Sequence, residues 1–352
     1  MKIGILAPPY LSVPPKAYGG TEKIVSLLAD GLVDRGHDVT LFASGDSQTR
    51  AKLVSVYPEG LGNSGFNKDL PYLPLIHYRE CFRRADEFDI IHNHAQYLAM
   101  FQAEFSKTPV VHTIHGSYYP GEIPKEKRRV LETFKHFNFI SISENQRLGM
   151  RELNFAATVY NGIDISQFEY VEKTKGEYLL WVGRIVEKKG PLPAIETARK
   201  LNLPLVIAAA IDPADRAYYE NEIKPLIDGK QVSFIGEINH ETSSGLYGNA
   251  ICTLFPITWH EPFGLVMVES MACGTPVVAY NCGSVPEIVE DGKTGFTVDT
   301  ESGVGGLVHA VREIDRIQRG DCRARVSEKF SKEVMVEGYE KVYKKIIPEV
   351  SS

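Results

Sequence analysis

Two glutamates lie on either side of a predicted turn and helix start. Glu261 precedes a Pro-Phe-Gly turn, and Glu269 lies within the apolar run 265–273, which predicts a buried helix closed by Gly274. Backbone N–H groups at the start of a helix lack intrahelical partners and can bind phosphate. Two carboxylates around such an anion site suit a sugar-phosphate ligand. The alternative is an ordinary connection with one solvated glutamate and one capping glutamate.

Two basic residues follow a strand predicted at 178–182. Arg184 and Lys189 lie on a loop between Gly183 and Gly190. Arginine offers a fixed fork of donors and lysine a mobile point charge, and both suit phosphate oxygens. Such groups could stabilise the negative charge that a departing diphosphate gains in the transition state. Taken alone, the same loop could be a solvated surface.

A glycine pair separates the first predicted strand, 2–7, from a helix predicted at 21–35. Gly19 and Gly20 would let the backbone approach a phosphate at the start of this helix, with Thr21 beside them. Thr21 could equally be only an N-cap. The GxGxxG fingerprint is absent from this connection, which argues against a dinucleotide-dependent dehydrogenase.

Four histidines gather near the ends of two predicted strands. His92 and His94 share a strand face, so a zinc site is conceivable, and His112 and His115 follow at the next strand. No HExxH motif accompanies them, so a zinc hydrolase remains a minor alternative. His112 is expected to be a core histidine.

Composition and charge set outer limits on the function. The 352 residues are 43% hydrophobic and 24% charged, as expected for a globular protein of two domains. The net charge of −6 argues against a nucleic-acid partner. Five cysteines without metal-type spacing, and a start without an apolar signal core, predict a cytoplasmic protein. We expect no transmembrane segment, because no apolar run is long enough.

Short apolar runs alternate with longer amphipathic ones, which predicts βα units around parallel sheets. Strands are expected at 2–7, 38–43, 90–92, 110–114, 139–143 and 158–160, and again at 178–182, 205–209, 232–235, 251–255, 277–279 and 295–298. The charged, irregular stretch between the two series predicts a linker. We therefore expect domains at 1–160 and 178–331, a linker at 161–177, and a ligand cleft at the carboxyl ends of the strands.

Taken together and in this order, the motifs resemble those of the family 4 retaining glycosyltransferases, which use nucleotide-sugar donors. The resemblance runs from Ile3 to about Phe296 and rests on four segments: 161–164, 183–190, 260–275 and 284–296. It implies an α/β protein of the GT-B fold, in which two Rossmann-like β/α/β domains face each other across an inter-domain cleft. It also implies that the terminal helix, 332–347, packs back onto the first domain.

The resemblance also implies roles for individual residues. The expected catalytic residues are His115, Arg184, Lys189 and Glu261. The expected donor-binding residues are Gly19, Gly20, Thr21, Ile238, Phe263, Gly264, Leu265, Val266 and Glu269. The residues expected near the acceptor are Ser143, Glu144 and Arg147, although Ser143 could simply cap a helix. Glu269 would bind the ribose hydroxyls, Glu261 the hydroxyls of the transferred sugar, and His115 would support positive character at the anomeric carbon.

The implied activity is transfer of a hexosyl group from a nucleoside-diphosphate sugar, most commonly UDP-glucose, to an acceptor hydroxyl with retention of configuration. We expect no cofactor and no metal, since Arg184 and Lys189 would stabilise the leaving group. The acceptor is expected to be a small molecule or a saccharide. A lipid acceptor with peripheral membrane contact stays open, because residues 125–137 could form a basic amphipathic helix. The alternatives are a nucleotide-sugar epimerase of the same fold and a glycoside hydrolase using Glu261 and Glu269.

Overall fold

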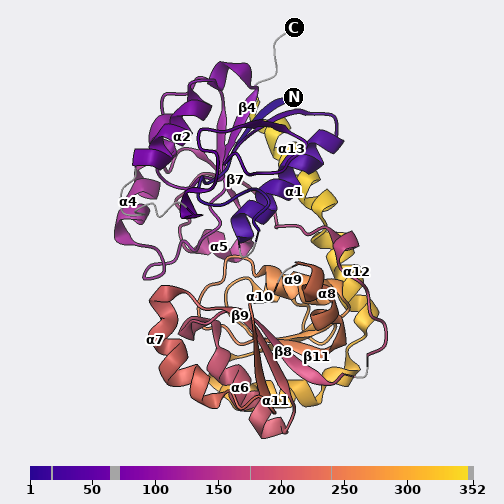
Figure 1. Cartoon of the computed structure of the whole chain (residues 1–352). Coiled ribbons are helices and arrows are strands. Elements are labelled where there is room, and N and C mark those ends of the chain that lie inside the picture. Colours follow the sequence, from indigo (N-terminus) through magenta and orange to yellow (C-terminus); the bar gives the residue numbers. More distant parts are fainter. Residues whose placement is uncertain (17–18, 64–71, 175, 239, 348–352) are drawn as a thin grey trace. The chain divides into compact units, whose positions relative to one another are not determined.

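The chain folds into two compact units. The computed structural model describes residues 1–16, 19–63, 72–174, 176–238 and 240–347. Unit 1 comprises Met1–Gly162 and the C-terminal segment Lys332–Ser352, and unit 2 comprises Ile163–Ser331. Figure 1 shows that each unit has its own sheet flanked by helices. The predicted class, two α/β domains built on parallel sheets, is confirmed.

Unit 1 is built on a parallel sheet whose described strands run in the order β3-β2-β1-β4-β5-β6-β7. The strands are β1 (Lys2–Leu6), β2 (Asp38–Phe42), β3 (Lys52–Val54), β4 (Ile90–Asn93), β5 (Val110–His112), β6 (Asn138–Ser141) and β7 (Phe155–Thr158). The order reverses between β1 and β4. Because parallel strands are joined by right-handed crossovers, this reversal places helices on both faces of the sheet.

The helices of unit 1 bury apolar faces against this sheet. They are α1 (Gly20–Asp34), α2 (Tyr72–Phe82), α3 (Met100–Ala103), α4 (Lys125–Thr133), α5 (Glu144–Leu148) and α13 (Lys332–Ile346), with single turns η1 (Leu61–Asn63) and η2 (Ala85–Glu87). In α1 the fully buried residues recur at helical spacing: Ile24, Val25, Leu28, Ala29 and Leu32. Tyr78 of α2 lies in one hydrophobic core cluster with Leu6 of β1 and Phe42 of β2.

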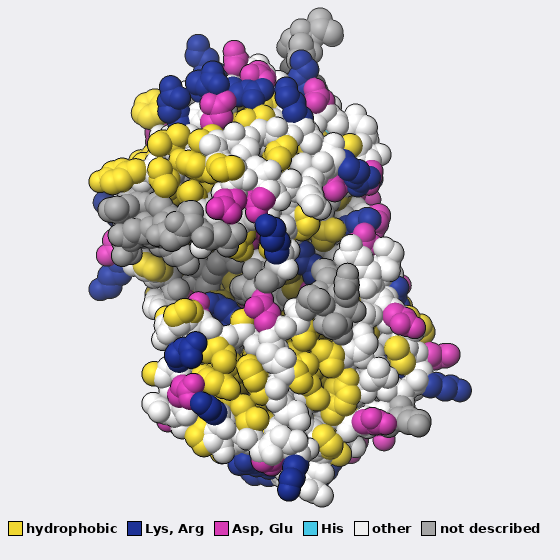
Figure 2. Space-filling model, viewed as in Figure 1, with side chains coloured by type: hydrophobic (Ala, Val, Ile, Leu, Met, Phe, Trp, Pro, Cys, Tyr) yellow, Lys and Arg dark blue, Asp and Glu magenta, His cyan; other side chains and the backbone are white. Residues whose placement is uncertain are grey.

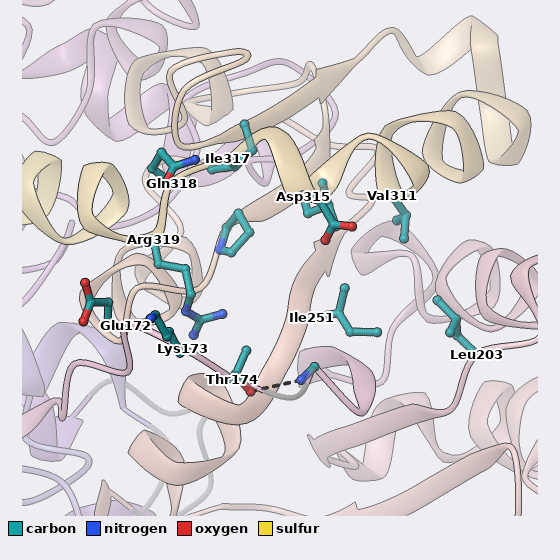
Figure 3. Close-up of a pocket in the computed structure, with 13 residues that line it drawn as sticks. Glu172, Lys173, Thr174, Leu203, Ile251, Val311, Asp315, Ile317, Gln318 and Arg319 are labelled. Carbon is teal, nitrogen blue, oxygen red and sulfur yellow. Dashed lines mark hydrogen bonds between the residues drawn. The ribbon is translucent and has the colours of Figure 1, made fainter.

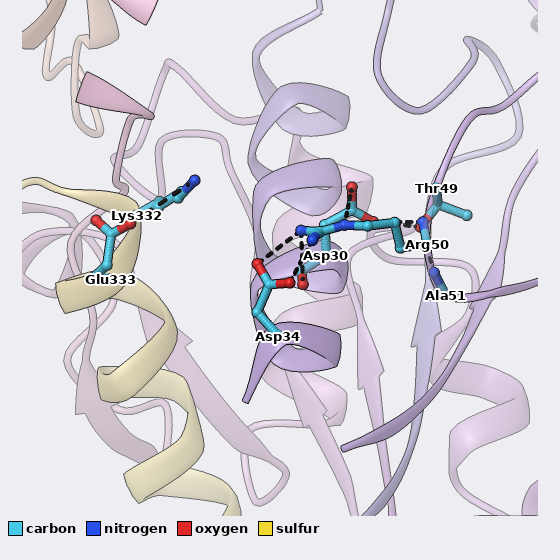
Figure 4. A network of polar contacts seen from close by, with 7 residues as sticks. All are labelled: Asp30, Asp34, Thr49, Arg50, Ala51, Lys332 and Glu333. Carbon is cyan, nitrogen blue, oxygen red and sulfur yellow. Dashed lines mark hydrogen bonds and ion pairs between the residues drawn. The ribbon is translucent and has the colours of Figure 1, made fainter. Parts of the chain in front are cut away.

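The C-terminal helix α13 packs on α1 although the two are far apart in the chain. Gly31 leaves room for Val336, whose Cγ2 lies 2.6 Å from where a Cβ on residue 31 would stand. At the end of α1, Arg35 Nε donates to Glu340 Oε2 over 2.6 Å. Arg50, in the segment before β3, forms ion pairs with Asp30 and Asp34 in the C-terminal part of α1 (Figure 4). Apolar packing and charge pairs thus both attach α1 to its neighbours.

Unit 2 repeats the doubly wound pattern. Its described strands run β10-β9-β8-β11-β12-β13, all parallel. They are β8 (Tyr178–Arg184), β9 (Leu205–Ala210), β10 (Val232–Gly236), β11 (Ala250–Phe255), β12 (Val277–Tyr280) and β13 (Gly295–Val298). The helices are α6 (Pro191–Leu201), α7 (Arg216–Tyr218), α8 (His240–Asn249), α9 (Leu265–Ala272), α10 (Val285–Ile288), α11 (Gly303–Arg312) and α12 (Arg319–Lys329). The short turns are η3 (Ile165–Gln167), η4 (Glu187–Lys189), η5 (Pro213–Asp215), η6 (Tyr219–Ile223), η7 (Lys224–Leu226), η8 (Thr300–Ser302) and η9 (Ile314–Arg316).

Two strands of unit 1 differ from the sequence prediction. The last strand was expected at 158–160, but β7 spans Phe155–Thr158, and β3 was not predicted. Both lie at the edges of the sheet and none of their residues is fully buried. An edge strand exposes one side, so it needs no continuous apolar run, and Ala156 and Ala157 carry little β-propensity. The residues at 158–160 include the β-branched Thr158 and Val159, so the strand was predicted there instead.

Candidate functional site

The candidate site of unit 2 lies at the carboxyl ends of β8 and β11. These strands are neighbours, and the strand order reverses between them. Loops after two such strands leave the sheet in opposite directions, so open α/β sheets bind ligands at this point. The loop after β8 carries Lys188 and Lys189, and the loop after β11 carries Glu261.

Gly190 determines how the basic loop approaches its neighbour. It adopts a left-handed φ of 73°, and a Cβ there would stand 2.0 Å from the carbonyl oxygen of Pro256. Only glycine permits that approach without strain. Two further hydrogen bonds hold the loop: Trp181 Nε1 donates to the carbonyl of Lys189 over 3.2 Å, and Thr258 N donates to that of Lys188 over 2.9 Å.

Lys189 and Glu261 form an ion pair between these two loops. Trp259 Nε1 donates a second hydrogen bond to the same oxygen, Glu261 Oε2, over 3.1 Å. The side chains of Lys189 and Glu261 are only 16% and 12% exposed. The indole of Trp259 also lies under a second ammonium, since Lys188 Nζ is 4.1 Å from its ring centroid. The arrangement therefore places two cations and one carboxylate at the end of the sheet.

The loop that carries Glu261 is held by the connection after β12. Ser284 N donates to the carbonyl of Glu261 over 3.0 Å, and Ser284 Oγ donates to the carbonyl of Phe263 over 2.7 Å. Gly283 lies so close that a Cβ there would be 2.4 Å from Glu261 N. Residues 284–296 were named only among the segments that carry the family resemblance, and this contact with the glutamate loop was not predicted.

Arg184 ends β8 but pairs with a different loop. Its Nη1 lies 3.8 Å from Oδ2 of Asp212, which follows β9. Asp212 also accepts a hydrogen bond from Ala214 N over 3.0 Å and thereby starts η5. Both side chains of the Arg184–Asp212 pair are more than a third exposed, at 36% and 42%. The guanidinium is therefore within reach of solvent and of an anionic ligand.

The start of α9 presents backbone groups and Glu269. Gly264 is the N-cap with a left-handed φ of 86°, and Leu265 and Val266 are the first residues of the helix. Phe263 before them is buried. Glu269 lies one turn into the helix and accepts a hydrogen bond from Tyr247 Oη of α8 over 3.1 Å. Burial, followed by the charge of Glu269, raises the pKa of Tyr247 well above its ordinary value, so this hydroxyl remains a donor.

Ile238 follows a strand that is further along the sheet than those that carry the other candidate residues. It follows β10, the edge strand, and is half-buried. Two strands, β9 and β8, separate β10 from β11. Ile238 can therefore contact only a ligand that extends along the carboxyl edge of the sheet, as a nucleotide base would.

In unit 1 the glycine loop leads directly into α1. Gly19 is the N-cap, and Gly20 and Thr21 are the first helical residues, so Thr21 is not the cap. A Cβ on Gly19 would lie 2.7 Å from Pro15. Glu22 in the same turn is buried, and burial raises the pKa of its carboxyl.

His115 follows β5 and is held from two sides. Its Nε2 lies 2.9 Å from Nδ1 of His94. Gln146 of α5 donates hydrogen bonds to the carbonyls of Ile114 and Gly116, each over 2.7 Å, and so fixes the backbone on either side of the imidazole. Burial lowers the pKa of His115 from 6.5 to about 4, so the ring is neutral at neutral pH. The supporting role of Gln146 was not predicted.

Two further predictions concerned the histidines: that His112 is a core residue, and that a zinc site was conceivable. His112 is buried, stacks on Phe137 with ring centroids 5.1 Å apart, and lies 3.0 Å from Asn93 Nδ2. It is a core residue, as expected. Within the described residues, no group of histidine, cysteine and carboxylate side chains could hold a metal ion. The absence of a metal requirement stays a prediction.

The predicted acceptor-side residues surround the start of α5. Ser143 is the N-cap, and its Oγ accepts a hydrogen bond from Gln146 N over 3.0 Å. Glu144 and Arg147 are 3.6 Å apart as an ion pair. Arg147 also donates to Thr158 Oγ1 over 3.2 Å. Capping and local pairing thus account for much of what these three side chains do in the free protein.

A separate pocket of unit 2 lies at the opposite edge of its sheet (Figure 3). Its volume is about 670 Å³, and it is lined by residues at the amino-terminal ends of strands, such as Ile251 at the start of β11 and Pro276 just before β12, and by Arg319. The guanidinium of Arg319 donates to the carbonyls of Val171 and Gly248, over 2.7 and 2.8 Å. This arginine therefore closes the amino-terminal edge of the sheet and is far from the groups at the carboxyl ends.

Comparison with known families matches both units. The family model for "Glycosyltransferase Family 4" matches residues 18–167, and that for "Glycosyl transferases group 1" matches residues 163–330. Among curated relatives, a phosphatidyl-myo-inositol mannosyltransferase from Mycolicibacterium smegmatis is 26% identical, over 94% of this chain and 89% of its own length. A glycogen synthase from Mycobacterium tuberculosis is 24% identical over 86% and 83%.

Solved structures share the fold over nearly the full length. A sucrose-phosphate synthase from Thermosynechococcus elongatus has a TM-score of 0.81 at 20% identity, covering 98% of both chains. The Anabaena protein HepE, solved in complex with UDP-glucose, has a TM-score of 0.75 at 20% identity, covering 98% of this chain and 100% of HepE. At such low identity these matches show the fold alone, which is the expected GT-B fold.

Proposed function

Because this chain belongs to the family 4 glycosyltransferases, we propose that it transfers a hexosyl group from a nucleoside-diphosphate sugar to an acceptor hydroxyl with retention of configuration. The observation that carries the proposal is the Lys189–Glu261 ion pair at the carboxyl ends of β8 and β11. Charged groups of both signs there suit a ligand with an anionic diphosphate and a hydroxyl-rich sugar. The HepE complex with UDP-glucose and the sugar-transferring relatives support a donor of this kind.

Lys189 and Arg184 are the residues that we propose to bind the diphosphate. Lysine supplies a point charge and arginine a fork, and the helix start at Gly264 to Val266 adds backbone donors. As the bond to the anomeric carbon breaks, the diphosphate gains negative charge. Cations held in place beforehand stabilise that charge without reorganising.

The two glutamates are proposed to bind hydroxyl groups. A carboxylate can accept two hydrogen bonds from a diol. Glu261 is held in place by Lys189 and Trp259, which leaves lone pairs for hydroxyls of the transferred sugar. Glu269 is oriented by Tyr247 and is assigned to the ribose, with Ile238 beside the base.

From unit 1 we propose that His115 contacts the transferred sugar, that Gly19, Gly20 and Thr21 approach the donor phosphates, and that Ser143, Glu144 and Arg147 approach the acceptor. The acceptor is proposed to be a small molecule or a saccharide. No described helix is long and apolar enough to cross a membrane.

A donor screen tests the proposal in two steps. Thermal-shift measurements with UDP, GDP, ADP and TDP should show one base raising the melting temperature, because a ligand that binds only the folded state stabilises it. Turnover of the matching sugar nucleotide is then followed with excess EDTA, and the anomeric configuration of the product is determined by NMR. We expect turnover without metal and a retained configuration. Loss of turnover that a divalent metal restores would refute the metal-free mechanism, and an inverted product would refute retention.

The alternatives predict different products. An epimerase of the same fold would convert the sugar nucleotide without any acceptor. A glycoside hydrolase using Glu261 and Glu269 would cleave an aryl glycoside with no nucleotide present and would not require Arg184 or Lys189. Either result would replace the transferase proposal.

A further inference from the structure

A chain of hydrogen-bonded side chains inside unit 1 connects His115 to the C-terminal helix. His115 Nε2 lies 2.9 Å from His94 Nδ1, and His94 Nε2 lies 3.2 Å from His92 Nδ1. His92 Nδ1 lies 2.6 Å from Tyr343 Oη of α13, and His92 Nε2 lies 2.8 Å from Thr113 Oγ1. His92, His94 and Tyr343 are completely buried. The chain thus runs from a residue proposed to contact substrate to a residue near the end of the sequence.

We propose that Tyr343, acting through His92 and His94, holds His115 in the tautomer protonated on Nε2, so that its Nδ1 accepts a hydrogen bond from a substrate hydroxyl. The part that concerns substrate rests on the proposed function. Tyr343, His92 and His94 are positioning residues in this scheme, and only His115 touches the ligand.

All three imidazoles are neutral at neutral pH. Burial lowers the pKa of His94 and of His92 well below 6.5, and the neighbouring histidines lower both further. Each neutral ring has one N–H donor and one nitrogen acceptor. Since the rings are joined nitrogen to nitrogen, the proton position on one ring determines that on the next. The chain can therefore adopt only two collective arrangements.

In the first arrangement every proton points away from the substrate side. His115 Nε2–H donates to His94 Nδ1, and His94 Nε2–H donates to His92 Nδ1. Tyr343 also donates its hydroxyl proton to His92 Nδ1, and His92 Nε2–H donates to Thr113 Oγ1. The two donors share the single lone pair of His92 Nδ1, with the shorter contact from Tyr343 at 2.6 Å and the longer one from His94 at 3.2 Å, and His115 presents a bare Nδ1.

In the second arrangement the protons are reversed. His92 Nδ1–H donates to His94 Nε2, and His94 Nδ1–H donates to His115 Nε2, so His115 would carry its proton on Nδ1. The hydroxyl of Tyr343 then faces an N–H at 2.6 Å and cannot donate to it. Among the described residues no other acceptor lies within hydrogen-bond distance of Tyr343 Oη. A buried hydroxyl proton without an acceptor costs free energy, so Tyr343 selects the first arrangement.

A bare, neutral Nδ1 suits the proposed chemistry. It can accept a hydrogen bond from a sugar hydroxyl, whereas an imidazolium would place positive charge beside a sugar that gains positive character as the leaving group departs. The chain also explains a structural feature of α13. This helix buries Tyr343 next to β4, where apolar packing alone would favour a phenylalanine.

NMR of the tautomers tests the proposal on the intact protein. Histidine is labelled with ¹⁵N, and two-bond nitrogen–proton correlation spectra report which nitrogen of each ring carries the proton. We expect His115, His94 and His92 of the wild-type protein to be protonated on Nε2. In Tyr343→Phe the selecting hydroxyl is gone, and we expect a redistribution toward the Nδ1–H form at His115. A wild-type His115 protonated on Nδ1, or unchanged tautomers in Tyr343→Phe, would overturn the proposal.

Tyr339→Phe is the matched control. Tyr339 lies one turn earlier on α13, and its ring packs at a tilt against His92 with ring centroids 5.0 Å apart, but no hydrogen bond joins its hydroxyl to the three described imidazoles. It should leave the tautomers unchanged. The melting temperatures of the two variants show whether Tyr343→Phe acts through general stability: equal melting temperatures with a tautomer shift in only one variant support the positioning role, and shifts in both overturn it.

Activity then reports on the substrate side. Tyr343→Phe should lower kcat/KM for the donor about tenfold, the effect of losing one hydrogen bond, and Tyr339→Phe should not. Unchanged kcat/KM in Tyr343→Phe despite a tautomer shift would overturn the role of Nδ1 as an acceptor. If the tautomers behave as expected but no sugar nucleotide is turned over, the proposed function fails and the positioning of His115 by Tyr343 stands.

Discussion

Lys189 and Glu261 form an ion pair that joins the loop after β8 to the loop after β11. Each of these residues is separated from its strand by several loop residues, so the pair depends on how Gly190 and Trp259 hold the loops. Trp259 donates to the same carboxylate oxygen as Lys189. A preformed pair of this kind keeps both charges in place before a ligand binds, which is the condition for efficient charge stabilisation.

Replacing Lys189 by Met should lower kcat on the order of a hundredfold, because the leaving diphosphate would lose a cation held close to it. Steady-state kinetics with the donor found in the screen measures the effect. Lys188→Met is the control, since Lys188 lies over the Trp259 ring but makes no ion pair with Glu261 among the described contacts. A normal kcat in Lys189→Met, or an equal loss in Lys188→Met, would remove Lys189 from the proposed role.

Glu269→Ala should weaken nucleotide binding by about 1–3 kcal/mol, because two hydrogen bonds to the ribose would be lost. Isothermal titration calorimetry with the preferred nucleoside diphosphate measures this. Tyr247→Phe keeps the carboxylate and removes only the hydrogen bond that orients it, so it should weaken binding less. Unchanged affinity in Glu269→Ala would rule out the ribose assignment.

The architecture was predictable because its cause is local. Apolar runs that are buried on both sides of a parallel sheet alternate with amphipathic helices, and the boundaries carry turn residues such as Gly190 and Gly264. The prediction was wrong where burial is one-sided, at the edge strand β7. There the pattern of side chains no longer distinguishes a strand from a loop.

The place of the candidate residues after predicted strands could be inferred from the sequence, while their roles stay predictions; their contacts could not be inferred. Lys189 and Glu261 stood out by type and by their place after a strand. Their pairing depends on the approach of Gly190 to Pro256, which involves segments distant in sequence. The contact of His92 with Tyr343 spans most of the chain and has no local signature. Supporting residues such as Gln146 and Ser284 are ordinary polar residues whose importance appears only in three dimensions.

Gly190→Ala should destabilise unit 2 by more than the ~1–2 kcal/mol of a left-handed alanine, because its Cβ would also meet the Pro256 carbonyl. Urea denaturation measures the free energy of unfolding. Gly229→Ala separates the two effects: its φ is 69°, yet nothing lies within 4 Å of a Cβ there. Equal losses in the two variants would show that the loop relaxes away from Pro256.

Stability should fall as the pH is lowered from about 6.5 to about 4. Burial lowers the pKa of His77 and His115 to about 4 and that of His112 to about 3. The unfolded chain therefore binds these protons at a higher pH than the folded chain, and each group contributes up to about 1.4 kcal/mol per pH unit in this window. Urea denaturation at several pH values measures the slope. His77→Gln should reduce it, and a flat profile between pH 6.5 and 4.5 would contradict the burial of these rings as neutral groups.

One face of unit 1 shows apolar side chains gathered over α2 (Figure 2). Tyr72 and Ile76 are exposed on α2. Phe101 is exposed on α3, and Phe105 is exposed just after it. A lipid acceptor would need such a surface together with basic side chains. The helix α4, Lys125–Thr133, carries the basic cluster that was predicted from the sequence, and its arginines decide how much of that charge is available.

We predict that the protein does not bind anionic liposomes tightly at physiological salt. Arg128 of α4 donates to the carbonyls of Tyr118 and Gly149, so its charge is committed to the fold. Arg129 is 81% exposed but pairs with Glu132 at 3.3 Å. The positive charge that remains on α4 is too small to bind the protein to an anionic membrane, because salt screens the attraction. Sedimentation with anionic vesicles at low and physiological salt measures binding, and Arg129→Glu with Lys125→Glu tests the cluster while leaving Arg128 in place. Tight, salt-sensitive binding that this double variant abolishes would contradict the prediction and favour a lipid acceptor.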